Sequence, residues 1–308
     1  MIAVLTGGTG GAKLIEGLAA EVDPSELTII CNTGDDCVFH GLNISPDIDT
    51  ILYTLAGLAD TEKGWGVKGD TFTALEQLRR LGNDAWFNLG DKDLAMHITR
   101  TKLLREGLPL SAVTERLCLA LGVRAMLVPM SDQTIESRVT TPRGEISFQE
   151  FFVKGRWAAE VTAVRFAGAE QSRPAPGVIE AIQSVSGIII CPSNPITSIG
   201  PILAVPGIRA ALEQVTVPVV AVSPLIGKAA ISGPAHKLMT ACGFEATALG
   251  VAQKYRGLLK TLLIDHADRK LAAGIEELGV DLGVTDIRMP TLADKRRLAR
   301  EVLAEVRK

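Results

Sequence analysis

The amino-acid sequence predicts an α/β fold: a doubly wound, mainly parallel, Rossmann-like sheet with a helical insertion over its ligand edge and a small β-hairpin. Three observations predict it. Residues 2–6 are β-rich, end in a glycine loop and lead into a helical pattern, and a second β-rich run follows at 27–31. The later runs 187–191 and 217–222 are apolar without alternation, as in strands that are covered on both faces. Such strands, separated by helical segments, are typical of a parallel sheet.

Length and composition fit one globular domain over residues 1–308. The 308 residues are 47% hydrophobic and 22% charged, and the formal net charge is −3. Lys and Arg are scattered along the chain, and aromatic residues make up only 4%. Proteins that bind nucleic acid usually carry a basic stripe or stacking aromatic side chains. We therefore expect small-molecule partners and no nucleic acid.

The cysteines and the hydropathy pattern predict a soluble, cytoplasmic protein. The five cysteines form no CxxC pair and no short metal-binding spacing, which favours reduced thiols. The first residues lead straight into a strand, so we expect no signal peptide. No apolar stretch reaches about 18 residues, so we expect no membrane-spanning helix.

A mainly helical block at about 50–124 is too long for a simple crossover between two strands. Helical spacing of apolar residues predicts helices at 51–58, 71–81, 94–106 and 111–121, the last with Ser111 as a plausible N-cap. We interpret the block as an insertion that stands over the ligand edge of the sheet.

The rest of the chain returns to alternating strands and helices. Residues 123–165 are rich in Val, Ile, Thr and Phe, which predicts a strand and then an antiparallel hairpin turning at 142–144. A helix is expected at 174–184, and strands at 187–191 and 217–222. Two more strands are expected at 243–248 and 258–264. An amphipathic helix from residue 292 onward closes the chain.

The stretch 32–50 (NTGDDCVFHGLNISPDIDT) follows a predicted strand and holds Asp35, Asp36, Asp47 and Asp49. Asp and Asn are poor strand and helix-interior residues, so the stretch is interpreted as a loop at a strand end. Ligands bind at such loops in open α/β sheets, and grouped carboxylates suit Mg²⁺. The alternative is a solvated loop that uses Asp and Asn only as turn residues.

The glycine loop at 7–13 (GGTGGAK) joins the first strand to a helix. Its glycines let backbone N–H groups approach a phosphate at the helix N-terminus. It lacks the spacing of a P-loop, and the third glycine of a GxGxxG motif would fall on Lys13. The second strand ends at Asn32, where an NAD enzyme usually presents an acid. Phosphate binding and a tight structural turn both remain open, and the context favours phosphate.

Two later loops also follow predicted buried strands. The loop 192–201 (PSNPITSIGP) combines three prolines with four polar side chains, which suits recognition of a nucleotide's phosphates or sugar. The loops at 223–227 (SPLIG) and 232–235 (SGPA) follow the next strand. Lys228, His236 and Lys237 lie near enough in sequence to add positive charge.

A second charged cluster lies at Asp91, Lys92 and Asp93, followed by His97 and Arg100. On a helix, Asp93 and His97 share one face, and so do His97 and Arg100. Taken alone, these residues are best interpreted as surface helix charges with a capping aspartate.

The motifs together resemble the 2-phospho-L-lactate transferase (CofD-like) family. The resemblance lies in GGTGGAK, NTGDD, SPDIDT, WGVKGDTF, LGDKDLAMH, PSNPITSIGPIL and SGPAHKLM, which run in the family's order from residue 4 to about 250. It implies a Mg²⁺-dependent transferase of coenzyme F420 biosynthesis. Such enzymes move a 2-phospholactyl or phosphoenolpyruvyl group from a guanosine-diphospho donor (LPPG or EPPG) to the deazaflavin Fo, giving F420-0 or its dehydro form and GMP. The form WFNLG at 86–90 resembles the bacterial members.

The resemblance also implies site residues. Asp49 matches the aspartate at the Fo site, and Asp35 matches a metal-binding aspartate; both are expected at the Mg²⁺ ion and in catalysis. Asn88 stands where archaeal members tend to have Arg or Lys, which is a departure. The expected residues are Asp49, Asn88, Asp91 and His97 for Fo, and Gly8, Thr9, Gly10, Gly11, Lys13, Ser193, Asn194, Thr197, Ser198, Ser223 and Gly227 for the nucleotide and phosphates.

Asp36 and Asp47 are expected only to shape turns, and Asp49 could act as general base or as metal ligand. The rival from another class is a regulatory protein of the gluconeogenesis-factor type that binds a nucleotide-sugar without turnover. An NAD(P)-dependent oxidoreductase is disfavoured by the broken fingerprint. The three-carbon donor and the number of subunits are left open, with a homodimer as one option.

Overall fold

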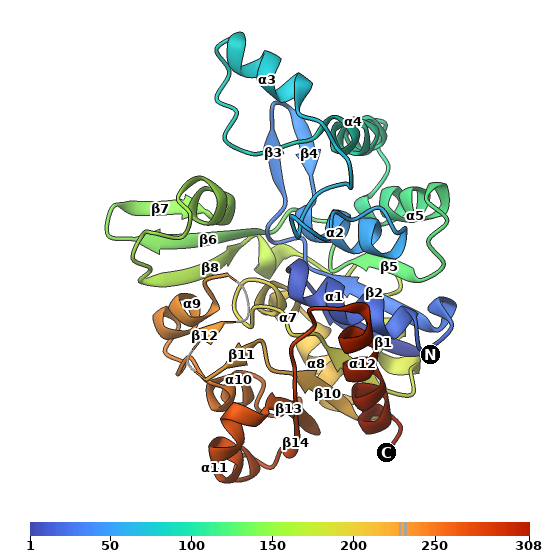
Figure 1. The fold of residues 1–308 in the computed structure, drawn as a ribbon, viewed down its shortest axis with the longest axis vertical. Coiled ribbons are helices and arrows are strands. Elements are labelled where there is room, and N and C mark those ends of the chain that lie inside the picture. The colour runs from blue at the N-terminus through green and yellow to red at the C-terminus, as the bar shows by residue number, and fades with distance from the viewer. Residues whose placement is uncertain (228, 231–232) are drawn as a thin grey trace.

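The computed structural model describes residues 1–227, 229–230 and 233–308. A seven-stranded parallel sheet forms its centre, in the order β14-β13-β10-β9-β1-β2-β5 (Figure 1). The strands are β1 (Ile2–Thr6), β2 (Leu27–Cys31), β5 (Met126–Pro129), β9 (Ile188–Ile190), β10 (Val219–Val222), β13 (Thr261–Asp265) and β14 (Asp281–Thr285). This confirms the predicted doubly wound, Rossmann-like sheet.

The strand order reverses between β1 and β9. The chain builds outward from β1 to β2 and β5, then returns to the other side of β1 and continues to β14. β1 pairs with β2 in the register Leu5↔Ile30 and with β9 in the register Leu5↔Ile190. In open α/β sheets, ligands bind at such a switch point beyond the carboxyl ends of the strands.

Two layers of helices cover the sheet because successive strand residues point to opposite faces. Ile2 and Val4 pack with α1, α2, α5 and α12, whereas Ala3 and Leu5 pack with α6 to α11. The helices are α1 (Gly8–Ala19), α2 (Pro46–Leu55), α3 (Thr73–Arg80), α4 (Asp91–Arg105), α5 (Leu110–Ala120), α6 (Val178–Ser184), α7 (Ile199–Ala204), α8 (Ile208–Gln214), α9 (Ala235–Ala241), α10 (Ala248–Lys254), α11 (Ala272–Glu276) and α12 (Leu292–Val306). Short helical turns are η1 (Pro24–Glu26), η2 (Glu150–Lys154), η3 (Ala169–Gln171) and η4 (His266–Leu271).

Among the described residues, three small antiparallel units stand outside the main sheet. They are the hairpin β3 (Cys37–Phe39) with β4 (Leu42–Ile44), the sheet of β6 (Glu136–Thr141), β7 (Gly144–Ser147) and β8 (Ala163–Ala167), and the pair β11 (Leu225–Ile226) with β12 (Ala229–Ala230). The β3–β4 hairpin rises from the sheet beside α4, with α3 at its far end (Figure 1). The predicted helical insertion and the hairpin turning at 142–144 are thus present.

The prediction of a single loop at 32–50 was wrong. Two short strands form inside the stretch, and α2 begins at Pro46. Proline at the first helical position has a preset φ and lacks only an N–H that the helix would leave unpaired. Asp47 and Asp49 then lie in the first turn of α2, where the helix dipole favours acidic groups.

Other element boundaries also differ from the predictions. Residues 148–153 belong largely to the helical turn η2 rather than to a strand, and the predicted strand at 243–248 is a turn over 243–247 followed by the first residue of α10. β14 was not predicted. Ser111 lies inside α5, whose N-cap is Pro109. The described residues contain no helix long and apolar enough to cross a membrane. That the chain is one domain stays a prediction.

Candidate functional site

The candidate site lies at the switch point, where β1, β2 and β9 end. The glycine loop after β1 is itself the first turn of α1, which begins at Gly8. The Gly7 amide donates a hydrogen bond to Ser193 Oγ at 3.3 Å, so the loops after β1 and β9 are joined. A Cβ at Gly10 would collide with the carbonyl oxygen of Pro192. Glycine is therefore required there by close approach of the two loops.

Asn32 connects three segments around this loop. It follows β2 and is fully buried. Its side-chain amide donates to Asp47 Oδ2 at 2.8 Å and to the Thr197 carbonyl at 3.2 Å, and its Oδ1 accepts from the Gly34 amide at 2.8 Å. This set of bonds holds α2 and the loop after β9 against the end of β2.

The side chain of Asp47, which belongs to α2, lies against the N-terminus of α1. Its Oδ1 accepts a hydrogen bond from the Gly8 amide at 2.8 Å. Burial raises the pKa of Asp47 to about 6, although the bonds from Asn32 and Gly8 favour the charged form. This carboxylate, expected from sequence only to shape a turn, therefore sits in the centre of the candidate site.

Asp35 is the second carboxylate at this point. Burial, followed by the charge of Asp47, raises the pKa of Asp35 well above its ordinary value. Its Oδ1 is buried and has no hydrogen-bond partner within the described ranges. Buried polar atoms are rarely left without a partner, so the orphaned oxygen points to a bound group.

The pair of Asp35 and Asp47 fits a hard divalent cation. Carboxylate oxygens are the ligands that Mg²⁺ prefers. Two buried, neighbouring carboxylates repel each other, and a cation between them would remove that repulsion. The donor set therefore suits Mg²⁺.

A large cavity opens beside Asp35. It has a volume of about 580 Å³ and lies between the β3–β4 hairpin and the segments around β6 and η2. Its apolar and aromatic lining residues are Val38, Phe39, Ile44, Trp86, Leu104, Leu110, Ile135 and Phe148. Its charged lining residues are Asp35, Asp36, Asp132, Glu136, Arg138 and Glu150. Apolar and aromatic side chains combined with a few polar groups are typical of a small-molecule site.

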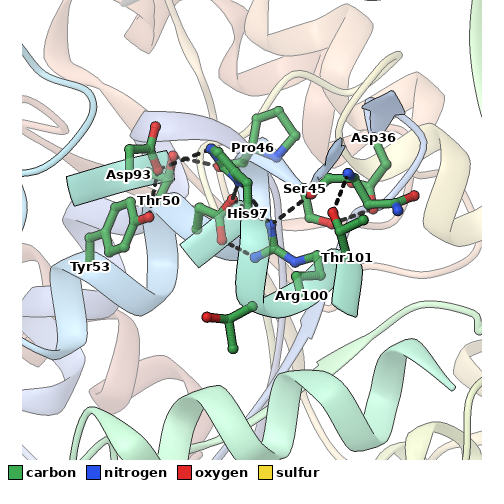
Figure 2. A network of polar contacts seen from close by, with 12 residues as sticks. Asp36, Ser45, Pro46, Thr50, Tyr53, Asp93, His97, Arg100 and Thr101 are labelled. Atoms are coloured by element: carbon green, nitrogen blue, oxygen red, sulfur yellow. Dashed lines mark hydrogen bonds and ion pairs between the residues drawn. The ribbon is translucent and has the colours of Figure 1, made fainter. Parts of the chain in front are cut away.

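Asp49 lies on the other side of α2, in a buried ion pair with Arg100 of α4. Arg100 Nη1 donates to Asp49 Oδ2 at 3.0 Å, and Nη2 donates to Asp49 Oδ1. His97 Nδ1 lies 3.6 Å from Asp49 Oδ2. His97 Nε2 lies 3.2 Å from Asp93 Oδ1, which also accepts from the Tyr53 hydroxyl at 2.6 Å. Figure 2 shows Arg100, His97 and Asp93 joined in this network with Tyr53.

Asn88 and Asp91, both expected at Fo, lie near α3. Asp91 Oδ2 accepts hydrogen bonds from Thr71 Oγ1 at 2.5 Å and from the Thr73 amide at 3.1 Å. These bonds, led by that of Thr71, lower the pKa of Asp91. Asp91 thus caps the start of α3. Asn88 is exposed, two residues after the cavity residue Trp86.

The residues of the 192–201 loop divide into two groups. Asn194 Oδ1 accepts from the Ile196 and Thr197 amides at 2.9 and 3.4 Å and so fixes the loop's own backbone. Ser193 and Ser198 lie against the glycine loop. Their hydroxyls are the side-chain donors of this loop nearest to the N-terminus of α1.

The remaining predicted phosphate residues are dispersed. Ser223 Oγ accepts from the Leu225 amide at 3.1 Å within its own turn, and the Gly227 amide donates to both oxygens of Asp268. Lys13 is exposed on α1 beside a smaller cavity of about 140 Å³ that Thr9 also lines. Lys228 and Ser232 lie outside the described residues.

Lys237 serves a structural purpose in this fold. Its Nζ donates to the carbonyls of Trp157 at 2.7 Å and Ala159 at 3.0 Å. Arg156 and Trp157 both have positive φ angles, 46° and 45°, which are unfavourable for such residues. Lys237 therefore stabilises a strained turn, and its charge is already satisfied there.

Sequence reasoning missed Asn32 and Asp47 as members of the site. The signal for Asp47 was Ser45-Pro46, since proline favours the first position of a helix. Once α2 starts at Pro46, Asp47 and Asp49 must point in nearly opposite directions, because residues two apart differ by about 200° around a helix. No local pattern marked Asn32.

The chain is similar to known proteins along its whole length. The family model described as "2-phospho-L-lactate transferase CofD" matches residues 2–296. A phosphoenolpyruvate transferase of Streptomyces griseus is 46% identical, and the match covers 99% of each chain. A 2-phospho-L-lactate transferase of Methanothermobacter thermautotrophicus is 44% identical, covering 99% of this chain and 98% of the relative.

Solved structures support the fold. A member of the UPF0052 family from Bacillus halodurans matches with a TM-score of 0.66 at 18% identity, over 98% of both chains. At that identity the similarity concerns the fold alone.

Proposed function

This chain belongs to the 2-phospho-L-lactate transferase CofD family, and on that premise we propose that its acceptor is the deazaflavin Fo and its donor a guanosine-diphospho compound. It is a 2-phospho-L-lactate or phosphoenolpyruvate transferase, as its relatives are. The proposed products are F420-0, or its dehydro form, and GMP. One observation carries the proposal: Asp35 lines an aromatic-lined cavity of about 580 Å³ and neighbours Asp47, which bonds to Gly8 at the glycine-rich N-terminus of α1.

We place the donor's phosphates at the N-terminus of α1. The amides of the first helical turn have no partners within the helix, and the dipole favours anions there. The Gly8 amide already donates to Asp47, so the amides of Thr9, Gly10 and Gly11 are left for phosphate. Ser193 and Ser198 add hydroxyl donors from the loop after β9.

We place Fo in the large cavity. The rings of Phe39, Trp86 and Phe148 line it, and aromatic faces stack on flat ring systems. Asp35 and Asp36 also line it, so a ribityl chain running toward them would bring its terminal hydroxyl to the phosphates. Asn88, two residues after Trp86, is placed at the ring, whereas Asp91 bonds to Thr71 and His97 Nδ1 bonds to Arg100 Nη1.

We propose that Asp35 and Asp47 hold the Mg²⁺ ion. The ion would supply charge neutralisation for the diphosphate of the donor. Asp49 was also expected as a ligand, but both of its oxygens bond to the positively charged Arg100, which would oppose a cation. The two donors to Asp47, by contrast, are neutral amides. Its role as metal ligand or base stays a prediction.

The reaction exchanges one oxygen–phosphorus bond for another. The terminal ribityl oxygen of Fo bonds to the phosphorus nearer the three-carbon unit, and the bond from that phosphorus to the bridging oxygen breaks. GMP leaves with the electron pair, and its phosphate takes up the hydroxyl proton. Phosphoryl transfer needs little covalent help from a protein, so the residues act by positioning and by charge.

Product analysis tests the proposed function. The protein is incubated with Fo, Mg²⁺ and either the phospholactate or the phosphoenolpyruvate donor, and the products are weighed by mass spectrometry. We expect GMP and a deazaflavin enlarged by the phosphorylated three-carbon group. Formation of neither product with either donor would overturn the proposal.

Fluorescence titration with Fo separates this enzyme from the regulatory alternative. A protein that only senses a nucleotide-sugar has no site for a deazaflavin, so Fo would bind without saturation. The identity of 46% to a phosphoenolpyruvate transferase favours the enzyme. A cytoplasmic location and a homodimer stay predictions; light scattering after size-exclusion chromatography measures the number of subunits.

A further inference from the structure

Asp49 and Arg100 join two helices that otherwise belong to different parts of the fold. Asp49 lies in the first turn of α2, next to the sheet, and Arg100 lies in α4 of the helical insertion. The Arg100 side chain is fully buried, and that of Asp49 is 6% exposed. Two parallel hydrogen bonds between a guanidinium and a carboxylate fix orientation as well as distance.

Asp47 and Asp49 lie on opposite sides of α2 and contact different parts of the fold. Two residues along a helix turn the side chain through about 200°, so the two carboxylates point nearly opposite ways. Asp47 bonds to Gly8 and Asn32 at the switch point, and Asp49 bonds to Arg100. Any rotation of α2 that releases Asp49 also moves Asp47.

α4 is itself anchored around Arg100. Arg100 Nη1 also donates to the Asn43 carbonyl at 3.4 Å, and the Asn43 amide donates to Thr101 Oγ1 at 2.7 Å. On the other side, His97 and Asp93 connect to Tyr53 of α2. Figure 2 shows His97 and Arg100 between Thr50 and Tyr53 on one side and Ser45 and Asp36 on the other.

The same network is a poor second metal site. Ligating atoms of Asp49, Asp93 and His97 lie within 4.8 Å of one another, as in a metal centre. However, the Arg100 cation already bonds both oxygens of Asp49, and Asp93 accepts from the Tyr53 hydroxyl. A divalent cation there would have to displace or oppose a buried guanidinium.

We propose that Asp49 and Arg100 are positioning residues: their ion pair sets the rotation of α2 and thereby places the Asp47 carboxylate against Gly8 and beside Asp35. Asp49 then acts on transfer through Arg100 and α2, without touching the metal or Fo. The activity readout of this inference rests on the proposed function, whereas its metal-binding readout does not.

A double-mutant cycle on the full-length protein tests the inference. The variants are Asp49→Asn, Arg100→Gln and the two combined, and the surface pair Asp23→Asn with Arg124→Gln is the matched control. We expect each buried single change to lower kcat/KM about 10- to 100-fold, and Asp49→Asn to add less than about 3-fold in the Arg100→Gln background, because paired residues act as one unit. If Asp49→Asn lowers kcat/KM in that background by the same factor as in the unchanged protein, the inference is overturned.

Metal affinity gives a readout that does not need turnover. Mn²⁺, used in place of Mg²⁺, is titrated into the protein without substrates. Asp49→Asn and Arg100→Gln should weaken binding by similar factors of about 3 to 10, whereas Asp35→Asn should abolish it. Loss of binding in Asp49→Asn but not in Arg100→Gln would make Asp49 a ligand and contradict the inference.

A double variant in which apolar residues replace both Asp49 and Arg100 tests the inference even if the single variants unfold. Removing one partner leaves an uncompensated buried charge, but replacing a whole buried ion pair by apolar residues is often tolerated. We expect Asp49→Leu combined with Arg100→Met to fold and to bind Mn²⁺ no more than about 10-fold more weakly than the unchanged protein, because neither residue touches the ion. A folded double variant without Mn²⁺ binding would overturn the inference.

The two proposals fail in different ways. Absence of any transfer product from the unchanged protein would count against the proposed substrates, and the Mn²⁺ titrations would still test the positioning pair. Normal transfer by the unchanged protein, together with a full further loss from Asp49→Asn in the Arg100→Gln background, would count against the positioning pair alone.

Discussion

The Asp47 carboxylate accepts a hydrogen bond from the Gly8 amide at 2.8 Å, across 39 positions of the chain. It thereby brings an acidic group to the positive end of the α1 dipole. An anionic substrate that binds at the same helix end would meet a carboxylate already in place. A cation between this carboxylate and the phosphates would remove the repulsion between their negative charges, which is the role proposed for Mg²⁺.

Replacing Asp35 by Asn should lower transfer at least about 100-fold and abolish metal binding, because the change removes a charged ligand. Thermal unfolding at pH 7.5 should not move to lower temperature, since the Asp35 carboxylate is buried without a partner for Oδ1. Steady-state kinetics, Mn²⁺ titration and circular dichroism measure the three effects. Asp84→Asn, at an exposed ion pair, is the control. Normal transfer by Asp35→Asn would contradict the assignment.

The metal-free protein should lose stability as the pH rises from 4 to 7. Burial raises the pKa of Asp47 to about 6 in the folded protein, against about 3.9 in an unfolded chain. The folded state therefore holds a proton that the unfolded chain has released in this window. The stabilisation is complete below pH about 4 and is lost as the pH passes 6.

Thermal unfolding in a chelating buffer measures this dependence. Asp47→Asn should reduce it and leave the part that comes from Asp35, whose pKa is also raised. Mg²⁺ added at pH 7.5 should raise the Tm of the unchanged protein because the ion binds only the folded state. An unaltered pH dependence in Asp47→Asn would show that other groups cause it.

Gly10→Ala should weaken donor binding and destabilise the fold by about 1–3 kcal/mol, the usual cost of an extra methyl group in a tight contact. Its Cβ would collide with the Pro192 carbonyl and push apart the loops after β1 and β9. Gly274→Ala is the control, because its Cβ would meet only Leu249 at ordinary contact distance. Calorimetric titration with GDP and thermal unfolding measure both effects; equal behaviour of the two variants would refute the argument.

Trp86→Ala should weaken Fo binding about 10-fold or more and leave the KM for the donor nearly unchanged, because Trp86 lines the large cavity away from the glycine loop. Trp65→Ala, which removes an aromatic ring from the smaller cavity, is the matched control. Quenching of Fo fluorescence measures the affinities. Equal loss of Fo binding in both variants would place Fo elsewhere.

Asn88→Arg should change the apparent affinity for Fo without affecting that for the donor. The position is exposed beside Trp86, so the larger side chain can reach the cavity entrance without disturbing the core. Fo and donor titrations of the variant measure the two affinities. A change confined to the donor would exclude Asn88 from the acceptor site.

Much of the sheet could be predicted from sequence because its signals are local. The runs around Ile2–Thr6 and Leu27–Cys31 are apolar throughout, and a strand covered on both faces needs that composition. β14 was missed because Asp281 and Gly283 interrupt its apolar pattern. It lies at the edge of the sheet, where pairing with β13 decides the structure.

The site was predicted in outline but not in its internal pairing. The acidic stretch and the glycine loop were correctly expected at neighbouring strand ends. The roles within the stretch depended on α2, whose start at Pro46 turned Asp47 toward Gly8 and Asp49 toward Arg100. Lys237, expected to add charge near a ligand, instead closes a strained turn at Trp157.

The sequence by itself determined most strands of the central sheet, the glycine loop and the residues that resemble a transferase family. These depend on patterns within a few residues, or on motifs that keep their order. Only the tertiary structure decided which carboxylates face one another. Asp35, Asp47 and Asn32 meet because β1, β2 and β9 end at one edge, and Asp49 meets Arg100 because α4 folds back over α2. Such contacts depend on packing between distant segments, which local composition does not specify.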